Sequence, residues 1–387
     1  MQRRIAVVTT SRADYSHLYW VLRDLDEHPS IDLKLIATGA QLADEFGAAV
    51  REIEYDGFTV DERVECLLSS DTDVGMAKTI GVATLGLAEV LGRLRPDLLL
   101  LIADRYEMLA PASVALALRI PIAHIEGGDV SEGAIDDAVR NALTKMSHLH
   151  FTPTETAKRR VIAMGEEPWR VHRTGAPSLD HLVRNTLVPR DELQQELGIT
   201  LADDAVVVAY HPVTLARDTL RETDALFGAL ERLSGQVLFC FPNADAGSRE
   251  LFGRADAFCD ARADAQMFVN LHPLRYWSLL ACASAMLGNS SSGIMESPSL
   301  ALPCVNVGIR QRGRERAVNI IDVEAETDVI LAAVERARSM DFKQSLAGMN
   351  NPYGDGSAAK RIVERIAATE FGEKLLIKRA VKQNLAG

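Results

Sequence analysis

Short apolar runs alternate along this chain with segments whose apolar residues recur at helical spacing. In the first half the runs lie at residues 5–8, 33–37, 98–102, 120–124, 149–151 and 171–174. In the second half they lie at residues 205–209, 237–241, 285–287 and 304–307. Runs of about five apolar residues between helical patterns are typical of parallel strands that are buried on both faces. We therefore predict an α/β protein with two Rossmann-like, doubly wound parallel sheets that face each other across a cleft.

The boundaries between these predicted domains follow from where the pattern weakens. Residues 182–189 have a weak pattern and end in Pro189, which is typical of a linker. We therefore expect a first domain over residues 1–183 and a second over residues 190–365. The remaining residues, 366–387, are expected to form a basic terminal helix.

Composition excludes several classes of protein. A chain of 387 residues with 47% hydrophobic and 25% charged residues is typical of a soluble protein with about two domains. The net charge of −12 argues against sequence-independent nucleic-acid binding. The apolar run at residues 5–8 is too short for a signal peptide, and we expect no segment of the roughly 20 apolar residues that a membrane span needs. Five scattered cysteines without a CxxC motif indicate neither disulfides nor a metal site, and we expect a cytoplasmic protein.

Two carboxylates follow neighbouring apolar runs of the first half. Asp104 comes just after the run at 98–102, and Glu126 comes just after the run that ends at His124. Ligands of open α/β sheets bind at the carboxyl ends of the strands, where two acids can move a proton on and off a substrate. Capping of the following helices is the alternative for each acid alone.

Three further segments offer groups that bind anions. Residues 9–16 (TTSRADYS) and 288–296 (GNSSSGIME) each present hydroxyls at a predicted strand end, where a helix begins. Glu296 can accept hydrogen bonds from ribose hydroxyls. Residues 310–316 (RQRGRER) hold four arginines, whose planar groups bind phosphate at two points. The alternatives are a polar turn in which Asp14 caps a helix, a plain serine-rich turn and a solvated basic loop.

His211 follows the first run of the second half and can act as a general acid toward a leaving group, although a lone histidine is often structural. The chain has no GxGxxG fingerprint, no GxSxG elbow and no HExxH motif. A nicotinamide enzyme, a serine hydrolase and a zinc enzyme are therefore poorly supported.

Taken in order, these segments resemble the hydrolysing UDP-N-acetylglucosamine 2-epimerases, which serve sialic-acid and legionaminic-acid synthesis. The segments that carry the resemblance lie at residues 12–16, 104–105, 124–128, 135–137, 211–214, 241–248, 288–291 and 308–310. The resemblance implies a glycosyltransferase-B-like fold whose terminal helix crosses back onto the first domain. It also implies a UDP-sugar substrate, no cofactor, no metal, and a homodimer or homotetramer.

The resemblance also assigns roles to residues. The catalytic residues that it implies are Asp104, Glu126, Asp136 and His211. The substrate-binding residues that it implies, or that lie beside the acids, are Arg12, Ser16, Arg105, His124, Asn243, Ser290, Ser291, Glu296 and Arg310. The chemistry that the resemblance implies is anti elimination of UDP to a 2-acetamidoglycal, followed by hydration.

Three points stay open at this level. The sugar is either UDP-N-acetylglucosamine, which we favour slightly, or UDP-2,4-diacetamido-2,4,6-trideoxyglucose. The carboxylate that acts as the base at C2 is not identified. A glycosyltransferase of the same fold and a catalytically silent sugar-nucleotide sensor are the rival functions.

Overall fold

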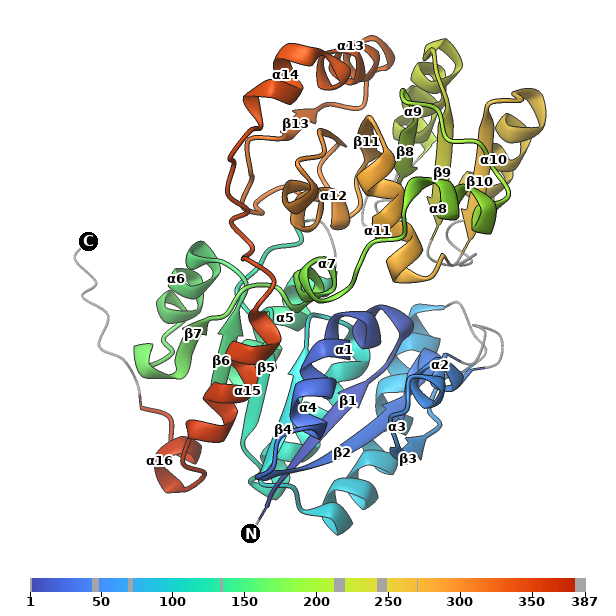
Figure 1. Cartoon of the computed structure of the whole chain (residues 1–387). Coiled ribbons are helices and arrows are strands. Elements are labelled where there is room, and N and C mark those ends of the chain that lie inside the picture. Colours follow the sequence, from blue (N-terminus) through green and yellow to red (C-terminus); the bar gives the residue numbers. More distant parts are fainter. Residues whose placement is uncertain are drawn as a thin grey trace. The chain divides into compact units, whose positions relative to one another are not determined.

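The computed structural model describes residues 2–43, 49–68, 72–132, 135–211, 220–241, 249–269 and 271–379. The chain divides into two compact units, which are coloured along the sequence in Figure 1. Unit 1 comprises Met1–Asp129, Ile135–Asp180 and Gly356–Gly387, and unit 2 comprises Val130–Ala134 and His181–Asp355.

Unit 1 is built on a parallel sheet of seven strands in the order β3-β2-β1-β4-β5-β6-β7. The strands are β1 (Arg3–Thr9), β2 (Ile31–Thr38), β3 (Val60–Val64), β4 (Leu98–Ile102), β5 (Ile122–Ile125), β6 (Leu149–Thr152) and β7 (Val171–Arg173). Its helices include α1 (Arg12–Asp26), α2 (Val50–Tyr55), α3 (Asp73–Leu94), α4 (Leu109–Leu118), α5 (Ile135–Met146), α6 (Glu155–Ala163), α15 (Ala358–Ala368) and α16 (Glu373–Leu376). The strand order reverses between β1 and β4, and open sheets of this kind bind ligands at such a point.

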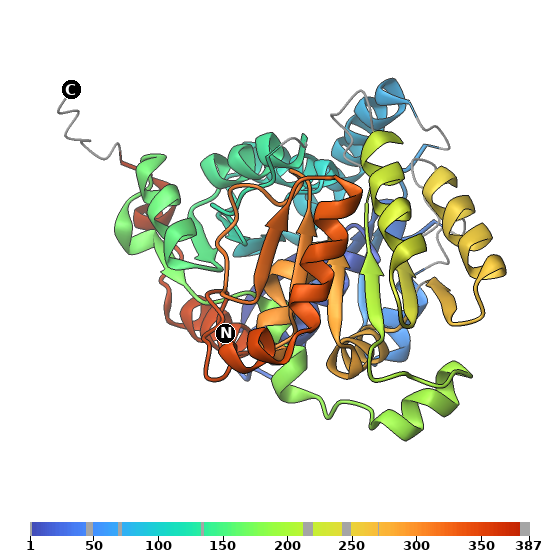
Figure 2. The ribbon, with the colours of Figure 1, turned by 90° about the horizontal axis from the view of Figure 1, so that it is seen from above.

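Unit 2 has a parallel sheet of six strands in the order β10-β9-β8-β11-β12-β13. The strands are β8 (Val206–Ala209), β9 (Val237–Phe241), β10 (Ala265–Val269), β11 (Ala285–Gly288), β12 (Cys304–Val307) and β13 (Ile320–Val323). The helices are α8 (Arg190–Leu197), α9 (Leu220–Arg232), α10 (Arg249–Ala261), α11 (Pro273–Cys282), α12 (Ser292–Met295), α13 (Thr327–Arg338) and α14 (Met340–Ser345), and α7 (Asp180–Arg184) begins at the boundary with unit 1. Helices α9 and α13 pack against each other beside this sheet (Figure 2).

Both faces of the second sheet are buried, as the apolar runs predicted. Along β9, Phe239 and Phe241 enter one apolar cluster, whereas Leu238 and Cys240 enter the cluster on the opposite face. Successive side chains of a strand point to opposite faces, so a strand with helices on both sides needs a continuous apolar run. The predicted fold class, two parallel-sheet α/β domains, is confirmed.

The last helices return to unit 1. The Asp180 carboxylate accepts hydrogen bonds from the Ala358 and Ala359 N–H groups at 2.8 Å each, which satisfies the start of α15. Arg3 donates to the carbonyls of Ile366, Ala367 and Thr369 at the other end of α15. The terminal segment was expected to begin at residue 366, whereas the chain belongs to unit 1 from Gly356 onward.

Helix α3 is the one helix within the described ranges that is long and apolar enough, by length and composition, to cross a membrane. No such segment was expected from the sequence. About a third of its apolar window (33%) is buried, and the helix packs against α4 and β3. Val74, Val82 and Leu85 are exposed along it.

Candidate active site

Two of the predicted acids lie at the carboxyl edge of the unit 1 sheet, on turns with unusual backbone geometry. Asp104 follows Ala103, which has φ = 57°, and Glu126 itself has φ = 65°. Non-glycine residues seldom adopt positive φ, and residues that do are concentrated at functional sites. Because β4 and β5 are neighbouring strands, both turns lie on the same edge of the sheet.

Asp104 forms an ion pair with Arg140, one of the few nearly fully buried arginines. Arg140 lies on α5, one helical turn after Asp136, so the same face of α5 carries the third predicted acid. The Asp104 carboxylate is therefore bound by a guanidinium at the sheet edge. The short helix that follows, Tyr106–Met108, has Arg105 at its N-cap and no side-chain cap hydrogen bond, so the helix-capping alternative for Asp104 is wrong. Sequence reasoning missed Arg140, although its i+4 spacing from Asp136 was a usable signal.

Glu126 is nearly buried, and its Oε1 lies 3.2 Å from Nδ1 of His17 on α1. The Glu126 N–H donates to the Phe151 carbonyl at 2.8 Å, which fixes the turn. The carboxylate is thus positioned from two directions, by its own backbone and by a side chain of α1. His17 was not among the predicted site residues.

His124 supports the turn that carries Asp104. It is fully buried, its Nε2–H donates to the Ala103 carbonyl at 2.8 Å, and its Nδ1 accepts from the Thr144 hydroxyl at 3.3 Å. Burial, which outweighs the hydrogen bond to Ala103, lowers the pKa of His124 to about 3. The imidazole is therefore neutral, and its hydrogen bonds hold the turn that carries Asp104, while its predicted contact with substrate stays a prediction.

The turn after β1 places the predicted residues Arg12 and Ser16 one helical turn apart on α1. The Arg12 guanidinium is bound by Glu52, with Nε at 3.0 Å from Oε2. Ser11, not Asp14, caps α1, so the capping alternative for Asp14 is wrong. Asp14 is buried and accepts hydrogen bonds from the Thr10 N–H and hydroxyl.

Arg105 lies beside these residues at the turn after β4. Two of its nitrogens donate to the fully buried Glu107, at 2.8 and 3.3 Å. Burial raises the pKa of Asp14, and the positive charge of Arg105 opposes that rise. The electrostatic interaction of Arg105 with Asp14 therefore connects the turn after β4 to the turn after β1, at the point where the strand order reverses.

In unit 2 the corresponding point lies between β8 and β11, and the Asn289 side chain joins the two turns. Its Oδ1 accepts from the His211 N–H at 2.7 Å, and its Nδ2 donates to the His211 carbonyl at 2.8 Å. The Asn289 carbonyl in turn accepts from Arg310 and Gln311, each at 2.8 Å. The neighbouring Gly288 has φ = 143°, and a Cβ there would collide with the Ala209 carbonyl. Asn289 was part of a predicted motif but had no predicted role.

His211 and Arg310 are thus both hydrogen-bonded to Asn289. Burial and the positive charge of Arg310 lower the pKa of His211 to about 3, so the ring is neutral at physiological pH. The other arginines of the predicted cluster bind elsewhere. Arg312 lies 3.7 Å from Glu324, Arg314 donates to the Val130 carbonyl, and Arg316 pairs with Asp322. Within the four-arginine cluster, Arg310 donates to the Asn289 carbonyl in the turn after β11.

The serine-rich turn forms a chain of hydroxyls. The Tyr276 hydroxyl lies 2.6 Å from Ser292 Oγ, which lies 3.3 Å from Ser290 Oγ. Ser291 occupies the N-cap position of the short α12, and the nearly buried Glu296 ends that helix. Asn243 lies outside the described residues. Among the residues that the structure describes, no group of three or more His, Cys, Asp or Glu side chains could hold a metal ion.

Comparison with known proteins agrees with this arrangement. A family model described as UDP-N-acetylglucosamine 2-epimerase matches residues 23–367. The UDP-N,N'-diacetylbacillosamine 2-epimerase (hydrolyzing) of Legionella pneumophila is 35% identical over 98% of this chain and 99% of its own. The GDP/UDP-N,N'-diacetylbacillosamine 2-epimerase (hydrolyzing) of Campylobacter jejuni is 35% identical over 89% of this chain and 90% of its own.

A solved structure extends the likeness to the fold. The UDP-GlcNAc 2-epimerase of Neisseria meningitidis, bound to UDP-GlcNAc, superposes with a TM-score of 0.82 at 19% identity. The match covers 95% of this chain and 100% of that one. With the family model matching most of its length, this chain belongs to the UDP-N-acetylglucosamine 2-epimerase family.

Proposed function

We propose that this protein is a hydrolysing 2-epimerase that releases UDP and a free, 2-epimerised sugar from UDP-N,N'-diacetylbacillosamine, that is, UDP-2,4-diacetamido-2,4,6-trideoxyglucose. The observation that carries the proposal is the placement of Asp104 and Glu126 on adjacent strained turns, with Asp136 on the helix whose Arg140 binds Asp104. Such an edge supplies carboxylates that give and take protons, which the reaction requires.

The proposed reaction has two steps. The C2–H bond of an N-acetylated sugar is barely acidic, so C1–O cleavage must lead or accompany proton removal. A carboxylate takes the C2 proton, a C1=C2 double bond forms, and the electrons of the C1–O bond leave with UDP. The oxygen of a water molecule then bonds to C1, a carboxylate takes the proton that this water loses, and a second acid delivers a proton to C2 on the opposite face. Neighbouring carboxylates can hold one acid ionised and another protonated.

Groups of unit 2 are proposed to hold and release the diphosphate. Arg310 and the hydroxyls of Ser290 and Ser291 would contact its oxygens, because charge-assisted hydrogen bonds are the strongest available to an anion. His211 is neutral in the free protein. The negative charge of a bound diphosphate would raise its pKa, and His211 would then supply a proton to the departing UDP.

The substrate assignment rests on relatives. Two proteins 35% identical to this chain, one of them over nearly its full length, are both named as hydrolysing diacetylbacillosamine 2-epimerases. UDP-N-acetylglucosamine, which the sequence analysis favoured slightly, differs at C4 and C6 and remains the second candidate. The solved relative bound to UDP-GlcNAc shares only 19% identity and supports the fold.

A proton NMR time course with each UDP-sugar tests the proposal. We expect free sugar of inverted C2 configuration plus UDP, formed faster from the diacetylated, 6-deoxy substrate. Transfer of the sugar to an added acceptor without inversion at C2 would establish a glycosyltransferase, and an unchanged substrate would establish a sensor. Turnover should also persist in excess EDTA.

We further propose a cytoplasmic homodimer or homotetramer. Exposed apolar residues on α3, at positions 74, 82 and 85, share one helical face, with Leu85 74% exposed. Apolar surface of this kind is stabilised by burial against another protein surface. Sedimentation analysis should therefore give a mass above that of one chain, and Leu85→Glu should lower it.

A further inference from the structure

A cleft of about 520 Å³ lies within unit 1, on the side of the sheet that ends in β7. Helix α6, edge strand β7 and helix α15 contribute its lining, and Figure 1 shows these elements together in unit 1. The lining residues are Lys158, His172, Arg173, Thr174, Arg361, Glu364, Arg365 and Ala368. None of them belongs to the candidate active site.

Positive charge predominates in this cleft. Four of its lining side chains are lysine or arginine, whereas Glu364 is the one carboxylate among them. Glu364 also lies 4.0 Å from Lys360 of the same helix, which offsets part of its negative charge. The whole chain carries a net charge of −12. A cationic cleft on an acidic protein is therefore a local feature, not a consequence of composition.

The pKa of His172 responds to the positive charges around the cleft. Burial, followed by the positive charges of Arg365 and Lys158, lowers the pKa of His172 to about 4. Positive charges on α15 and on α6 thus both act on the imidazole ring of His172. Arg361 donates to the Thr174 carbonyl at 3.1 Å, which holds its guanidinium at the carboxyl end of β7.

Protection of the sheet edge explains only part of this arrangement. A charged residue on an edge strand discourages pairing with another sheet, and Arg173 fits that purpose. Lys158, Arg361 and Arg365 come from helices, where edge protection does not require them.

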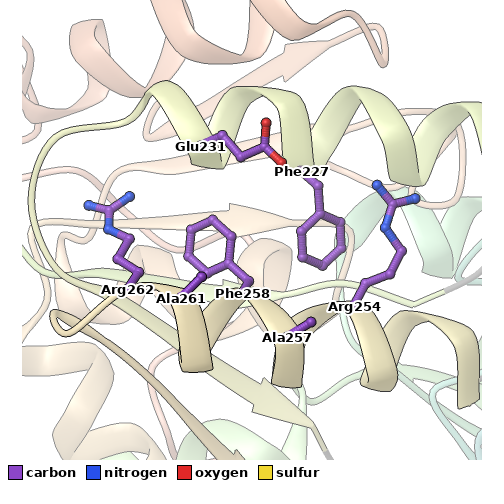
Figure 3. Close-up of a pocket in the computed structure, with 7 residues that line it drawn as sticks. All are labelled: Phe227, Glu231, Arg254, Ala257, Phe258, Ala261 and Arg262. Atoms are coloured by element: carbon purple, nitrogen blue, oxygen red, sulfur yellow. The ribbon is translucent and has the colours of Figure 1, made fainter.

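A second cleft offers a contrast. It lies between α9 and α10 of unit 2, and its lining includes Arg254, Arg262, Phe227 and Phe258 (Figure 3). There Arg254 pairs with Asp224, and Arg262 pairs with Asp264 at 2.6 Å. Both arginines also lie over phenylalanine rings. We draw no ligand from this second cleft, whose two arginines are each bound by a carboxylate and a phenylalanine ring.

We propose that the cleft lined by α6, β7 and α15 binds a small polyanion that carries two or more phosphate or carboxylate groups. Several cations around one cavity suit a ligand with more than one anionic group, since each group can be matched by its own charge-assisted hydrogen bonds. The site is independent of the proposed epimerase function, because it shares no residue with the groups assigned to catalysis or UDP binding.

The test uses the full-length protein labelled with ¹³C on histidine rings, with His172→Gln to assign the His172 signal. Titration with sodium pyrophosphate in the presence of saturating UDP should shift the His172 signal and raise the pH at which that ring titrates. Lys158→Ala combined with Arg365→Ala should weaken pyrophosphate binding by about tenfold or more for each cation removed. Arg159→Ala is the matched control on α6, since Arg159 lies outside the lining and donates to the Glu155 carbonyl, and it should leave binding unchanged.

Two further arms sharpen the assignment. Glu364→Gln should tighten binding, because it removes the carboxylate from the lining. A parallel titration with citrate, again in saturating UDP, distinguishes a carboxylate ligand from inorganic pyrophosphate. The proposal is overturned if no polyanion moves the His172 signal, or if the double variant binds pyrophosphate as the wild type does. Binding of orthophosphate as tight as that of pyrophosphate would exclude a polyanion site, and binding of RNA or acidic polypeptide alone would exclude a small ligand.

Discussion

The carboxyl edges of the two sheets share a topology but differ in how their functional groups are held. In unit 1 the strand order reverses between β1 and β4, and the side chains there are ionic: Asp104 with Arg140, and Arg105 with Glu107. In unit 2 the reversal lies between β8 and β11, and a single neutral amide, Asn289, joins the two turns. One fold thus supports an edge built from charges and an edge built from hydrogen-bonding amides and hydroxyls.

The difference corresponds to the proposed division of labour. Carboxylates that transfer protons must keep a fixed geometry near an ionic partner, and buried charges are costly unless they are paired. A site that holds a diphosphate gains more from neutral donors and one cation, because the ligand itself brings the charge. Strained backbone is found at the ionic edge, at Ala103 and Glu126, and costs about 1–3 kcal/mol for each such residue.

The largest effect, on turnover, is expected when the acids at the carboxyl edge of the unit 1 sheet are replaced by amides. Asp104→Asn, Glu126→Gln and Asp136→Asn should each lower turnover by about 10²–10⁴-fold, because an amide cannot exchange the proton, while UDP binding persists. Steady-state kinetics and calorimetry with UDP measure the two properties. Asp137→Asn is the matched control on α5, since Asp137 accepts from Asn141, and it should stay near wild-type turnover. Equal losses in Asp136→Asn and Asp137→Asn would contradict the assignment of Asp136.

The next largest effect, on the free energy of unfolding, is expected when Arg140, the ion-pair partner of Asp104, is replaced. Arg140→Met should lower the free energy of unfolding by about 3–5 kcal/mol, because it leaves a partly buried carboxylate without its ion pair. Urea denaturation measures the change. Replacing both partners, as in Asp104→Leu with Arg140→Met, should restore part of the stability but no activity. Arg93→Met, at an exposed pair with Glu62, should change stability little, and a loss equal to that of Arg140→Met would exclude a special role for the buried pair.

A third effect tests the neutral edge of unit 2. Arg310→Ala should weaken UDP binding by about 1.5–3 kcal/mol, or roughly 10- to 150-fold, because it removes a charge-assisted contact to the diphosphate. Arg316→Ala is the control, since Asp322 binds that guanidinium at 3.0 Å. Calorimetry showing unchanged UDP affinity in Arg310→Ala would remove Arg310 from the proposed diphosphate site.

The smallest effect concerns the histidine below the Asp104 turn. Because burial lowers the pKa of His124 to about 3, from about 6.5 in the unfolded chain, the folded protein favours the neutral ring. The resulting stability is present above pH 6.5 and is lost as the pH falls from there toward 3. His124→Asn should therefore make unfolding free energy less dependent on pH, by up to about 1.4 kcal/mol per pH unit in that range. An unchanged pH slope would show that His124 does not titrate on unfolding.

The sequence predicted the fold because buried parallel strands leave a direct signal. The apolar runs of β1, β2, β4 and β5 each matched an observed strand. The strands that the sequence analysis did not name are β3, β10 and β13, and all three are edge strands. An edge strand is less covered by helices, so polar residues such as those of β3 (VDERV) interrupt its apolar run.

The partners of the site residues were not predictable in the same way. Asp104 and Arg140 lie 36 residues apart, and His211 and Asn289 lie 78 apart. The folded sheet brings such pairs together at one edge, and apart from the i+4 spacing of Asp136 and Arg140 the local sequence pattern does not indicate them. His124 was predicted from its proximity to an acid, whereas its burial and its contacts with Ala103 and Thr144 depend on the folded sheet.

The central claim is that the carboxylates of unit 1 remove the C2 proton and that a solvent proton replaces it on the opposite face. Turnover of the UDP-sugar in heavy water, followed by proton NMR and mass spectrometry of the free sugar, tests this claim most directly. We predict a product that carries one deuterium at C2, with release of UDP. A product that retains its original C2 proton would contradict elimination and hydration, whatever the substitutions had shown.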